Sequence, residues 1–235
     1  MSTQTLLRIS LPGGVTLYPS HFREIVARLP GMPAALFHRD DKGKTINERP
    51  GIRFVGGLSW VGLLADSQQE PLLTAVAGAA ILAVSAFANH PCKVQIESLK
   101  FGLKLSYAPQ MYWVREMAIK RTSPKARAQE VDSLIAARAL TSIEGTCEKY
   151  GFDCPTGDQL EISTVEVIHE RGMNLETSTG LTGMFVHLVD AVIMVHADLD
   201  GMWFAGNLTA RGYGRLIRPR PGMRMAENKR GGVLK

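Results

Sequence analysis

The chain has 235 residues, with 27 Lys and Arg against 22 Asp and Glu, which gives a formal net charge of +5. Hydrophobic residues make up 45% and charged residues 21%, a balance that excludes a disordered chain and is ordinary for a globular protein. The charge is uneven: residues 211–235 hold eight basic residues and one acid, so residues 1–210 carry a net charge of −2. A basic end on a near-neutral body indicates an acidic partner, with nucleic acid as the leading candidate.

Targeting and redox features are sparse. The N-terminus has no basic start followed by an apolar run, so no secretory signal is expected. The three cysteines, Cys92, Cys147 and Cys154, lack a CxxC spacing and predict neither a disulfide framework nor a zinc site. We therefore expect a cytoplasmic protein. The length allows either one domain of about 200–250 residues or two domains of about 110 residues each.

One uncharged stretch, from Pro71 to Ala88, has the length of a short membrane span. It is rich in Ala and Gly, has no aromatic belt and is short for a hydrocarbon core of about 30 Å. We predict that it forms a buried, closely packed helix, and we expect no membrane partner.

The first half of the chain is expected to alternate between strands and helices. Its patterns predict strands at 5–10, 35–39, 52–55, 60–65 and 93–96. A helix with Ser20 as its N-cap falls between the first two strands, and the uncharged helix precedes the last one. The order strand, helix, strand, strand, helix, strand is that of a ferredoxin-like unit.

The second half is predicted to be less regular. Strands are expected at 101–107, 111–119, 160–168, 184–196, 203–205 and 215–217. A basic helix is expected to begin with Ser123 as its N-cap and Pro124 in its first turn, and to run to about Glu148.

These elements predict an α+β fold of tandem ferredoxin-like (RRM-like) βαββαβ units. The expected boundaries are 1–98 for the first unit, 99–222 for the second, about 120–150 for an inserted basic helical finger, and 223–235 for a basic flexible tail.

The most specific local pattern is the glycine-rich segment at 206–215. Three glycines within nine residues let the backbone approach a ligand closely and expose its N–H groups. Arg211 and Arg215 flank the last two glycines, so phosphate is the expected ligand. The spacing matches neither the dinucleotide fingerprint nor a nucleotide P-loop, and a plain glycine-rich hairpin with solvated arginines is the alternative.

This segment resembles the C-terminal glycine-rich loop of the RAMP superfamily, the RNA-binding proteins of CRISPR systems that are built from ferredoxin-like folds. Residues 36–39 (Leu-Phe-His-Arg), 50–54 (Pro-Gly-Ile-Arg-Phe) and 60–63 (Trp-Val-Gly-Leu) resemble a run of the CRISPR RNA-processing endonucleases in that superfamily. The resemblance spans most of 5–96 and 181–220. The divergent middle and its long basic helix are most similar to the type IV branch.

The resemblance implies an endoribonuclease that cuts precursor CRISPR RNA at the repeat hairpin and stays bound to the mature guide RNA. Such a cut, made without a metal, uses the 2′-hydroxyl of the substrate as nucleophile and leaves a 2′,3′-cyclic phosphate. The protein must align this hydroxyl with the phosphorus, stabilise the developing negative charge and move protons. The candidate catalytic residues are Tyr18, His21, Arg23, His38 and Arg39.

The roles within this group stay open. An arginine cannot act as a general base at ordinary pH, so Arg23 and Arg39 would act through charge and alignment. Either His21 or His38 can correspond to the usual histidine of the family, and each has a structural alternative as a packed histidine. If 35–39 is a regular strand, His38 and Arg39 face opposite sides and at most one reaches a common pocket.

The basic middle helix is the second predicted contact with RNA, although acids interrupt it and an ordinary solvated face is the alternative. Because A-form RNA has a narrow major groove, its contacts should be mainly to phosphates. The candidate RNA-binding residues are Arg115, Lys120, Arg121, Lys125, Arg127, Arg138, Gly206, Asn207, Arg211, Gly212, Tyr213, Gly214, Arg215, Arg218 and Arg220.

The predicted partners are a CRISPR repeat hairpin or guide RNA and other subunits of a CRISPR effector complex. A non-catalytic RAMP subunit that binds or caps guide RNA is the main alternative, and a generic RNA-binding ferredoxin-like protein is a third. Only the group around Arg23 and His38 favours the enzyme over these binding proteins. No His, Asp or Glu spacing indicates a metal site, and no cofactor is expected.

Overall fold

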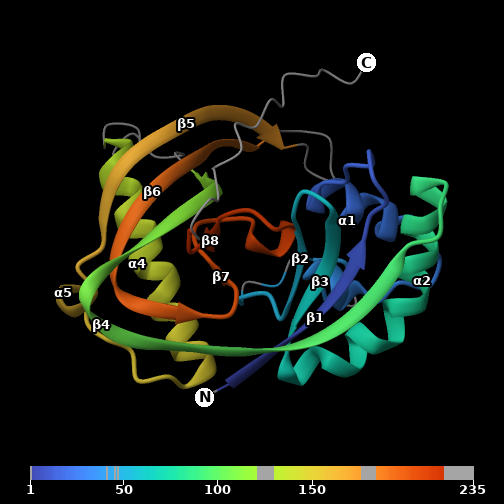
Figure 1. Cartoon of the computed structure of the whole chain (residues 1–235), viewed down its shortest axis with the longest axis horizontal. Coiled ribbons are helices and arrows are strands. Elements are labelled where there is room, and N and C mark those ends of the chain that lie inside the picture. The colour runs from blue at the N-terminus through green and yellow to red at the C-terminus, as the bar shows by residue number, and fades with distance from the viewer. Residues whose placement is uncertain are drawn as a thin grey trace.

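A computed structural model describes residues 2–40, 42–44, 46, 48–120, 130–175 and 184–219. The candidate RNA-binding residues Arg121, Lys125, Arg127 and Arg220, and the tail at 223–235, lie outside this described part. Two lobes lie side by side, and one long strand, β4 (Lys93–Ile119), runs through both of them (Figure 1). The expected boundary between residues 98 and 99 therefore falls inside a continuous strand.

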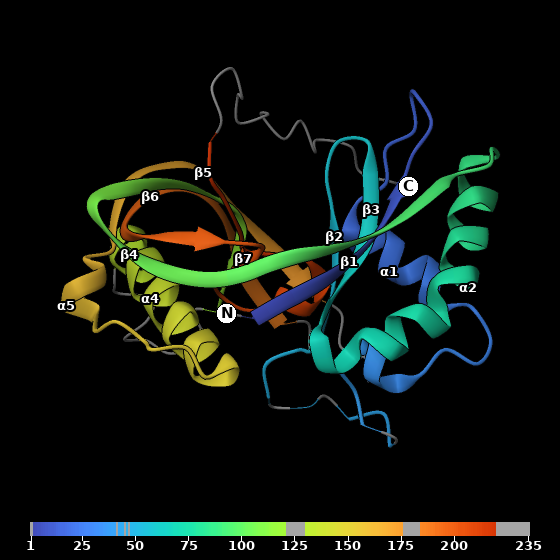
Figure 2. The same ribbon diagram turned by 60° about the horizontal axis from the view of Figure 1, so that its bottom comes forward.

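The N-terminal lobe is a sheet covered on one face by two helices. The strands are β1 (Ser2–Ser10), β2 (Ile52–Gly56), β3 (Trp60–Asp66) and the first part of β4, in the antiparallel order β2-β3-β1-β4. The helices are α1 (Pro19–Ala27) and α2 (Glu70–Ala88), which lie together on the same side of the sheet (Figure 2). Alternate strand residues such as Leu7, Ile9 and Leu63 point toward these helices and form the core with Phe22 and Leu73.

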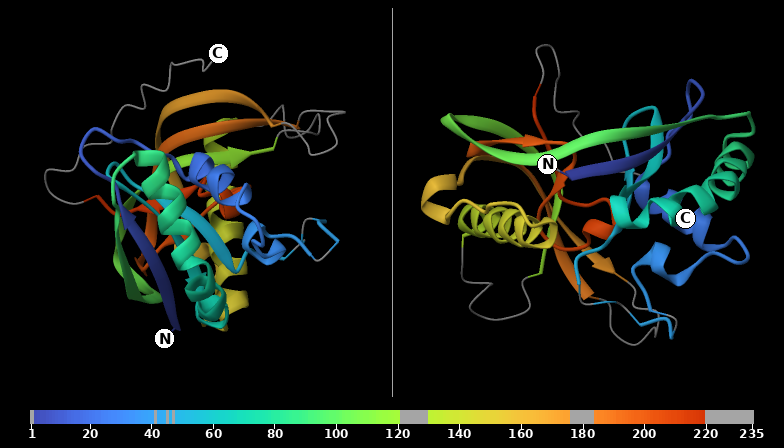
Figure 3. Two further views of the ribbon diagram at one scale, coloured as in Figure 1. Left: turned by 90° about the vertical axis from the view of Figure 1, so that its right-hand side faces the viewer. Right: turned by 90° about the horizontal axis from the view of Figure 1, so that it is seen from below.

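The C-terminal lobe continues the same sheet. Its strands are the rest of β4, β5 (Ser163–Leu175), β6 (Met184–Asp200), β7 (Trp203–Phe204) and β8 (Arg215–Ile217). The sheet continues in the order β4-β6-β5, and the short β8 pairs with the middle of β4. Helix α4 (Val131–Tyr150) and the short α5 (Gly157–Leu160) pack beside it, and the core gathers Ile135, Ile143, Val189 and Trp203 (Figure 3).

Three expected elements differ from the structure. Residues 35–39 are not a strand, because Pro33 leads into a 3₁₀ helix, η1 (Ala34–Phe37). Helix α1 begins at Pro19 after Tyr18, so Ser20 lies inside the helix and is not its N-cap. Glu130 is extended with ψ 144°, so α4 begins at Val131 and the prediction of a continuous helix from Ser123 is wrong.

Helix α2 buries only one face. Val76, Ala80 and Val84 are buried against the sheet, whereas Leu82 is 72% and Phe87 51% exposed. The prediction of a buried helix is therefore wrong for its outer face. By length and composition, Ser67–Ala88 is the one segment in the described ranges that could cross a membrane, and 28% of its most apolar part is buried. A single apolar helix of this kind is weak evidence for a membrane span.

Candidate RNA interface and cleavage site

The glycine-rich segment lies at the junction of the two lobes, between β7 and β8 (Figure 1). Gly212 has φ +85°, and a Cβ at this position would overlap the carbonyl oxygen of Phe54 on β2. Gly214 has φ +76°, and a Cβ there would overlap the carbonyl oxygen of Ala205. Glycine is therefore required at both positions by the close approach of the segment to both lobes.

The N–H groups of this segment are used within the protein. Gly206 donates to Ser142 Oγ at 3.0 Å, and Asn207 donates to the Ala118 carbonyl at 2.8 Å. The N–H groups of Arg211, Gly212 and Gly214 donate to the carbonyls of Leu208, Thr209 and Arg115. The expectation that these N–H groups are exposed for phosphate is therefore wrong, and the arginine side chains are left to bind an anion.

The side chain of Tyr213 is also used internally. It is buried in a small cluster with Ala118, Val186 and Leu188, and its ring anchors the segment to β4 and β6. Nearby, Lys120 donates its backbone N–H to Asn207 Oδ1 at 3.4 Å. Asn207 and Tyr213 thus have structural contacts in addition to their predicted contact with RNA.

Three arginines lie near enough for their charges to interact where this segment touches the N-terminal lobe. Arg23 on α1 donates from Nη2 to the Phe37 carbonyl at 3.5 Å, and its guanidinium lies 5.4 Å from the centroid of the Phe37 ring. Burial and, to a smaller extent, the charges of Arg211 and Arg39 lower the pKa of Arg23 to about 10. In the described part of the chain, Arg23 Nε is buried and has no hydrogen-bond partner. We call Arg23, Arg39 and Arg211 the arginine cluster.

The arginine cluster has the features of an anion site. Its three guanidinium groups come from α1, from the residues after η1 and from the glycine-rich segment. Among the described residues, Glu24 is the one carboxylate whose charge raises the pKa of Arg23, and its effect is smaller than those of burial and both arginines. Guanidinium groups bind phosphate through paired N–H donors, so a phosphate would balance this charge and satisfy the buried Nε.

His38 and Arg39 diverge, although they are neighbours. His38 ends η1 in the left-handed region, with φ 59°. Its ring is hydrogen-bonded to the backbone of Glu48 and Ile46, and burial together with the charges of Lys149 and Arg53 lowers the pKa of His38. Arg39 contributes its charge to Arg23. The structure therefore brings Arg39 into the arginine cluster and turns His38 toward a different part of the junction.

His21 and Tyr18 form a pair of their own. Their ring centroids lie 6.1 Å apart in an edge-on arrangement. His21 and Arg23 are two residues apart on α1, so they project from opposite flanks of the helix. Gly212 packs on Pro19, which lies on the Arg23 flank, so the glycine-rich segment does not bring His21 to the arginine cluster.

Two further arginines form a second basic position beside the segment. Arg115 on β4 and Arg215 on β8 are direct cross-strand partners. Arg215 donates to the Gly56 carbonyl at 3.3 Å and lies over the Trp60 ring at 5.7 Å. Burial lowers the pKa of Arg215 to about 10, with a smaller contribution from Arg115. Like charges in this position destabilise a sheet unless an anion lies between them.

The remaining described candidates are more dispersed. Arg218 is exposed and pairs with Asp198 at 2.6 Å, so part of its charge is already balanced. Arg138 is half-buried on α4. These residues do not join the arginine cluster.

The sequence did not indicate a group of charges that ties α4 to the N-terminal lobe. Asp66 at the end of β3 accepts hydrogen bonds from Lys149 and from the Tyr150 hydroxyl, and pairs with the buried Arg53 at 3.5 Å. Arg49 donates to the Thr141 carbonyl at 2.8 Å. We call this the Asp66 junction. Its one signal in the sequence is Arg53, a charged residue within an otherwise apolar strand.

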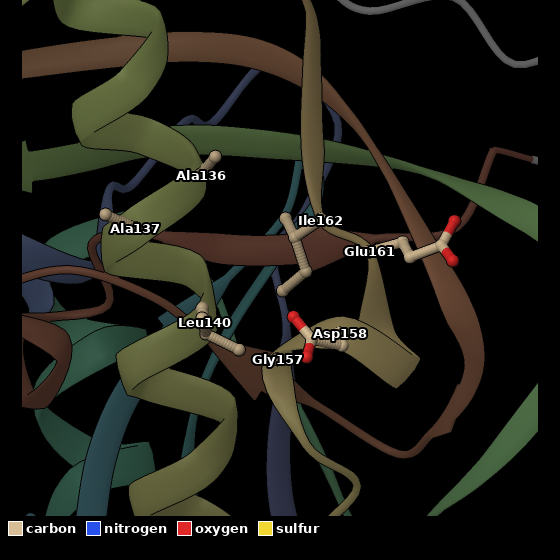
Figure 4. A pocket seen from close by; sticks show the side chains of 7 residues that line it. All are labelled: Ala136, Ala137, Leu140, Gly157, Asp158, Glu161 and Ile162. Carbon is tan, nitrogen blue, oxygen red and sulfur yellow. The ribbon is translucent and has the colours of Figure 1, made fainter.

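A hollow of about 510 Å³ lies between α4 and α5, away from both basic positions. Figure 4 shows its lining, in which Asp158 and Glu161 supply the charged groups. The residues that line it are Ala136, Ala137, Leu140, Gly157, Asp158, Glu161 and Ile162. An acidic lining repels a phosphate backbone, so this hollow is not a candidate for the RNA interface. Among the residues that the structure describes, no three His, Cys, Asp or Glu side chains form a group that could hold a metal.

Comparisons with known proteins bear on the family and the fold. The sequence model of a family described as type IV CRISPR-associated endonuclease Csf5 matches residues 1–221. A solved structure described as "Csf5, CRISPR-Cas type IV Cas6 crRNA endonuclease" is 33% identical, with a TM-score of 0.82, and the match covers 93% of this chain and 100% of that chain. A search of curated proteins found no match.

More distant structures share the fold. One described as "Crystal structure of Cas6b" is 12% identical with a TM-score of 0.63, over 93% of this chain and 100% of that one. Another, of "CRISPR RNA processing endoribonuclease Cas6b", is 11% identical with a TM-score of 0.54, over 92% of this chain and 100% of that one. These matches confirm the predicted ferredoxin-like fold of RAMP type, and the family match confirms the predicted type IV branch. The chain belongs to the family of type IV CRISPR-associated endonucleases, Csf5.

Proposed function

We propose that this chain cleaves precursor CRISPR RNA at its repeat hairpin, without a metal, by attack of the 2′-hydroxyl on the neighbouring phosphate. The products are a 2′,3′-cyclic phosphate and a free 5′-hydroxyl. The protein then stays bound to the mature guide RNA, in the cytoplasm, as part of an effector complex. The observation that carries this proposal is the arginine cluster at the junction of the lobes, in a chain that belongs to an endonuclease family.

The arginine cluster supports catalysis by charge. As the hydroxyl attacks, negative charge grows on the phosphate oxygens, and preorganised guanidinium groups stabilise it more than they stabilise the ground state. Arg23 is held in place by the Phe37 carbonyl and ring before RNA binds. With a pKa of about 10 it remains protonated at pH 7, so it acts as an electrostatic catalyst and not as a base.

Proton transfer is a smaller part of this proposal. The ring of His38 is already hydrogen-bonded to backbone groups, and His21 projects from the other flank of α1. We therefore assign both proton transfers to solvent water, which takes the hydroxyl proton and protonates the leaving 5′-oxygen, and we give His38 the role of holding Ile46 and Glu48. An enzyme that relies on charge and alignment without a matched base is expected to be slow.

RNA binding extends from the cluster to Arg115 and Arg215. This pair would hold a phosphate next to the one that is cleaved, on the opposite side of the glycine-rich segment. Lys120, Arg138 and the basic residues at 121–127 are proposed to contact the phosphates of the hairpin stem.

The test is cleavage of a labelled repeat hairpin in excess chelator, followed by analysis of the product ends. A 2′,3′-cyclic phosphate supports the proposal. A hairpin with a 2′-deoxy nucleotide at the cut site should bind with unchanged affinity and stay intact. Binding of the unmodified hairpin without cleavage would overturn the proposal in favour of a non-catalytic guide-RNA-binding subunit.

A further inference from the structure

Strand β4 is interrupted at the point where the glycine-rich segment reaches it. Its register against β6 shifts between Val114 and Met117, so Arg115 and Glu116 together oppose Asp190. Glu116 has φ +49°, a left-handed conformation that residues other than glycine rarely adopt. Such a bulge persists only where its surroundings hold it, and bulges are common beside functional sites.

Two charged side chains hold this bulge from neighbouring strands. Asp190 on β6 accepts a hydrogen bond from the backbone N–H of Glu116 at 2.7 Å. Arg171 on β5 reaches across β6 and pairs with the Glu116 carboxylate at 2.7 Å. The Glu116 side chain is 13% exposed and the Arg171 side chain 32%, so the carboxylate is the more shielded partner of this pair. Both ends of Glu116, its backbone and its carboxylate, are thus fixed.

The bulge in turn fixes the end of the glycine-rich segment. The N–H of Gly214 donates to the Arg115 carbonyl at 2.9 Å and to the Glu116 carbonyl at 3.1 Å. The Gly214 carbonyl accepts from the N–H of Ala205 at 2.8 Å, which closes the segment on itself. Both acceptor carbonyls belong to the bulged residues, so their directions depend on the left-handed turn at Glu116.

We propose that Asp190 and Arg171 are positioning residues for RNA cleavage. They hold the bulge at Glu116, the bulge holds Gly214, and Gly214 in turn fixes the segment that carries Arg211. Neither residue belongs to the arginine cluster or to the pair of Arg115 and Arg215. The inference rests on the proposed function, because it needs Arg211 to act on the phosphate.

A double-mutant cycle tests the proposal. The variants are Asp190→Ala, Arg211→Ala, their combination and Asp190→Asn, assayed by single-turnover cleavage and by affinity for the 2′-deoxy hairpin. Asp190→Ala should slow cleavage about tenfold or more, while Asp190→Asn keeps most of the rate because its amide oxygen still accepts the Glu116 N–H. In the Arg211→Ala background, Asp190→Ala should change the rate less than about twofold.

Asp158→Ala on α5 is the matched control, since Asp158 is an exposed acid in the hollow away from the interface, and it should cleave at the wild-type rate. If Asp190→Ala does not fold, Arg171→Gln tests the same bulge through its other partner. Arg171→Gln should slow cleavage in the wild-type background and have little effect in the Arg211→Ala background. The positioning role would be overturned if the fold-loss in cleavage rate of the double variant equalled the product of the losses of its two single variants. If the wild-type protein binds but does not cleave, the proposed function fails, and the same cycle read in RNA affinity still decides the positioning role.

Discussion

The two lobes meet through charged residues in two places, and these places are built in opposite ways. At the Asp66 junction, the Asp66 carboxylate pairs with two cations, Arg53 and Lys149, and accepts a hydrogen bond from the Tyr150 hydroxyl, so these cations face an anion of the protein itself. Nε and Nη1 of Arg53, like Nε of Arg23, have no hydrogen-bond partner among the described residues. At the arginine cluster, the strongest charges acting on Arg23 are those of two more arginines, and its Nε has no partner in the described part of the chain. Cations that face an internal carboxylate fasten the lobes together, whereas a cation whose strongest charged neighbours are other cations is suited to an anion that arrives from outside.

The strongest test of this contrast is Arg23→Ala. Removing a preorganised cation from a phosphate transition state should slow single-turnover cleavage by about 10²–10³-fold. Affinity for the 2′-deoxy hairpin should fall much less, because other phosphate contacts remain. Arg28→Ala, an exposed arginine one turn beyond, is the control and should leave both quantities near wild type. Equal losses of rate and affinity would assign Arg23 to binding alone.

Substitution of Asp66 should reduce the stability of the folded protein. Asp66→Ala leaves Arg53, whose side chain is 6% exposed, buried without its carboxylate, and this should lower the free energy of unfolding by about 3–5 kcal/mol. Chemical denaturation measures this change in the free energy of unfolding. Asp198→Ala breaks the exposed pair with Arg218 and should cost no more than about 1 kcal/mol. Similar losses for both variants would show that the Asp66 junction does not fasten the lobes.

Arg215→Gln should have a smaller effect on RNA binding. Loss of one phosphate contact should reduce the slope of log affinity against log salt by about 0.7–0.9, with weaker binding at low salt. Titrations of the 2′-deoxy hairpin at several salt concentrations provide the measurement. An unchanged slope would mean that Arg215 serves only its contacts with Gly56 and Trp60.

The smallest expected effect concerns pH. Because the pKa of Arg23 is lowered to about 10 in the free protein, its charge is present below that pH and is lost as the pH rises through it. The affinity for the 2′-deoxy hairpin should therefore fall more steeply for the wild type than for Arg23→Ala between about pH 9 and pH 11. Parallel curves for the two proteins would remove Arg23 from the phosphate site.

Sequence reasoning succeeded where a local pattern was sufficient. The strands at 52–55 and 60–65, the position of the glycine-rich segment and the family resemblance all depend on short runs of residues. It failed at residues 35–39, where five residues are too few for apolar alternation to separate a strand from the 3₁₀ helix that follows Pro33. The expected strand would also have separated His38 from Arg39, but in the structure the left-handed turn at His38 separates them.

The rest depends on distant residues. Asp66 and Lys149 are separated by 83 positions, and no periodicity connects them. The exposed outer face of α2 could not be predicted, because composition shows that a helix is apolar but not how many of its faces are covered. Likewise, the glycines indicated a close approach of the backbone, but their N–H groups are used by Ala118, Ser142 and Arg115.

Because β8 comes last in the chain and pairs with the middle of β4, the junction of the lobes is the last part of the fold to be synthesised. During synthesis, Arg23 and Arg39 emerge early, together with most of the first lobe, and both lobes are nearly complete before Arg211 and Arg215 leave the ribosome. A chain that stops short of residue 211 would have the first half of the phosphate site and lack the second. Tight retention of guide RNA would then be a property of the finished polypeptide alone, so prematurely terminated copies would not compete for it.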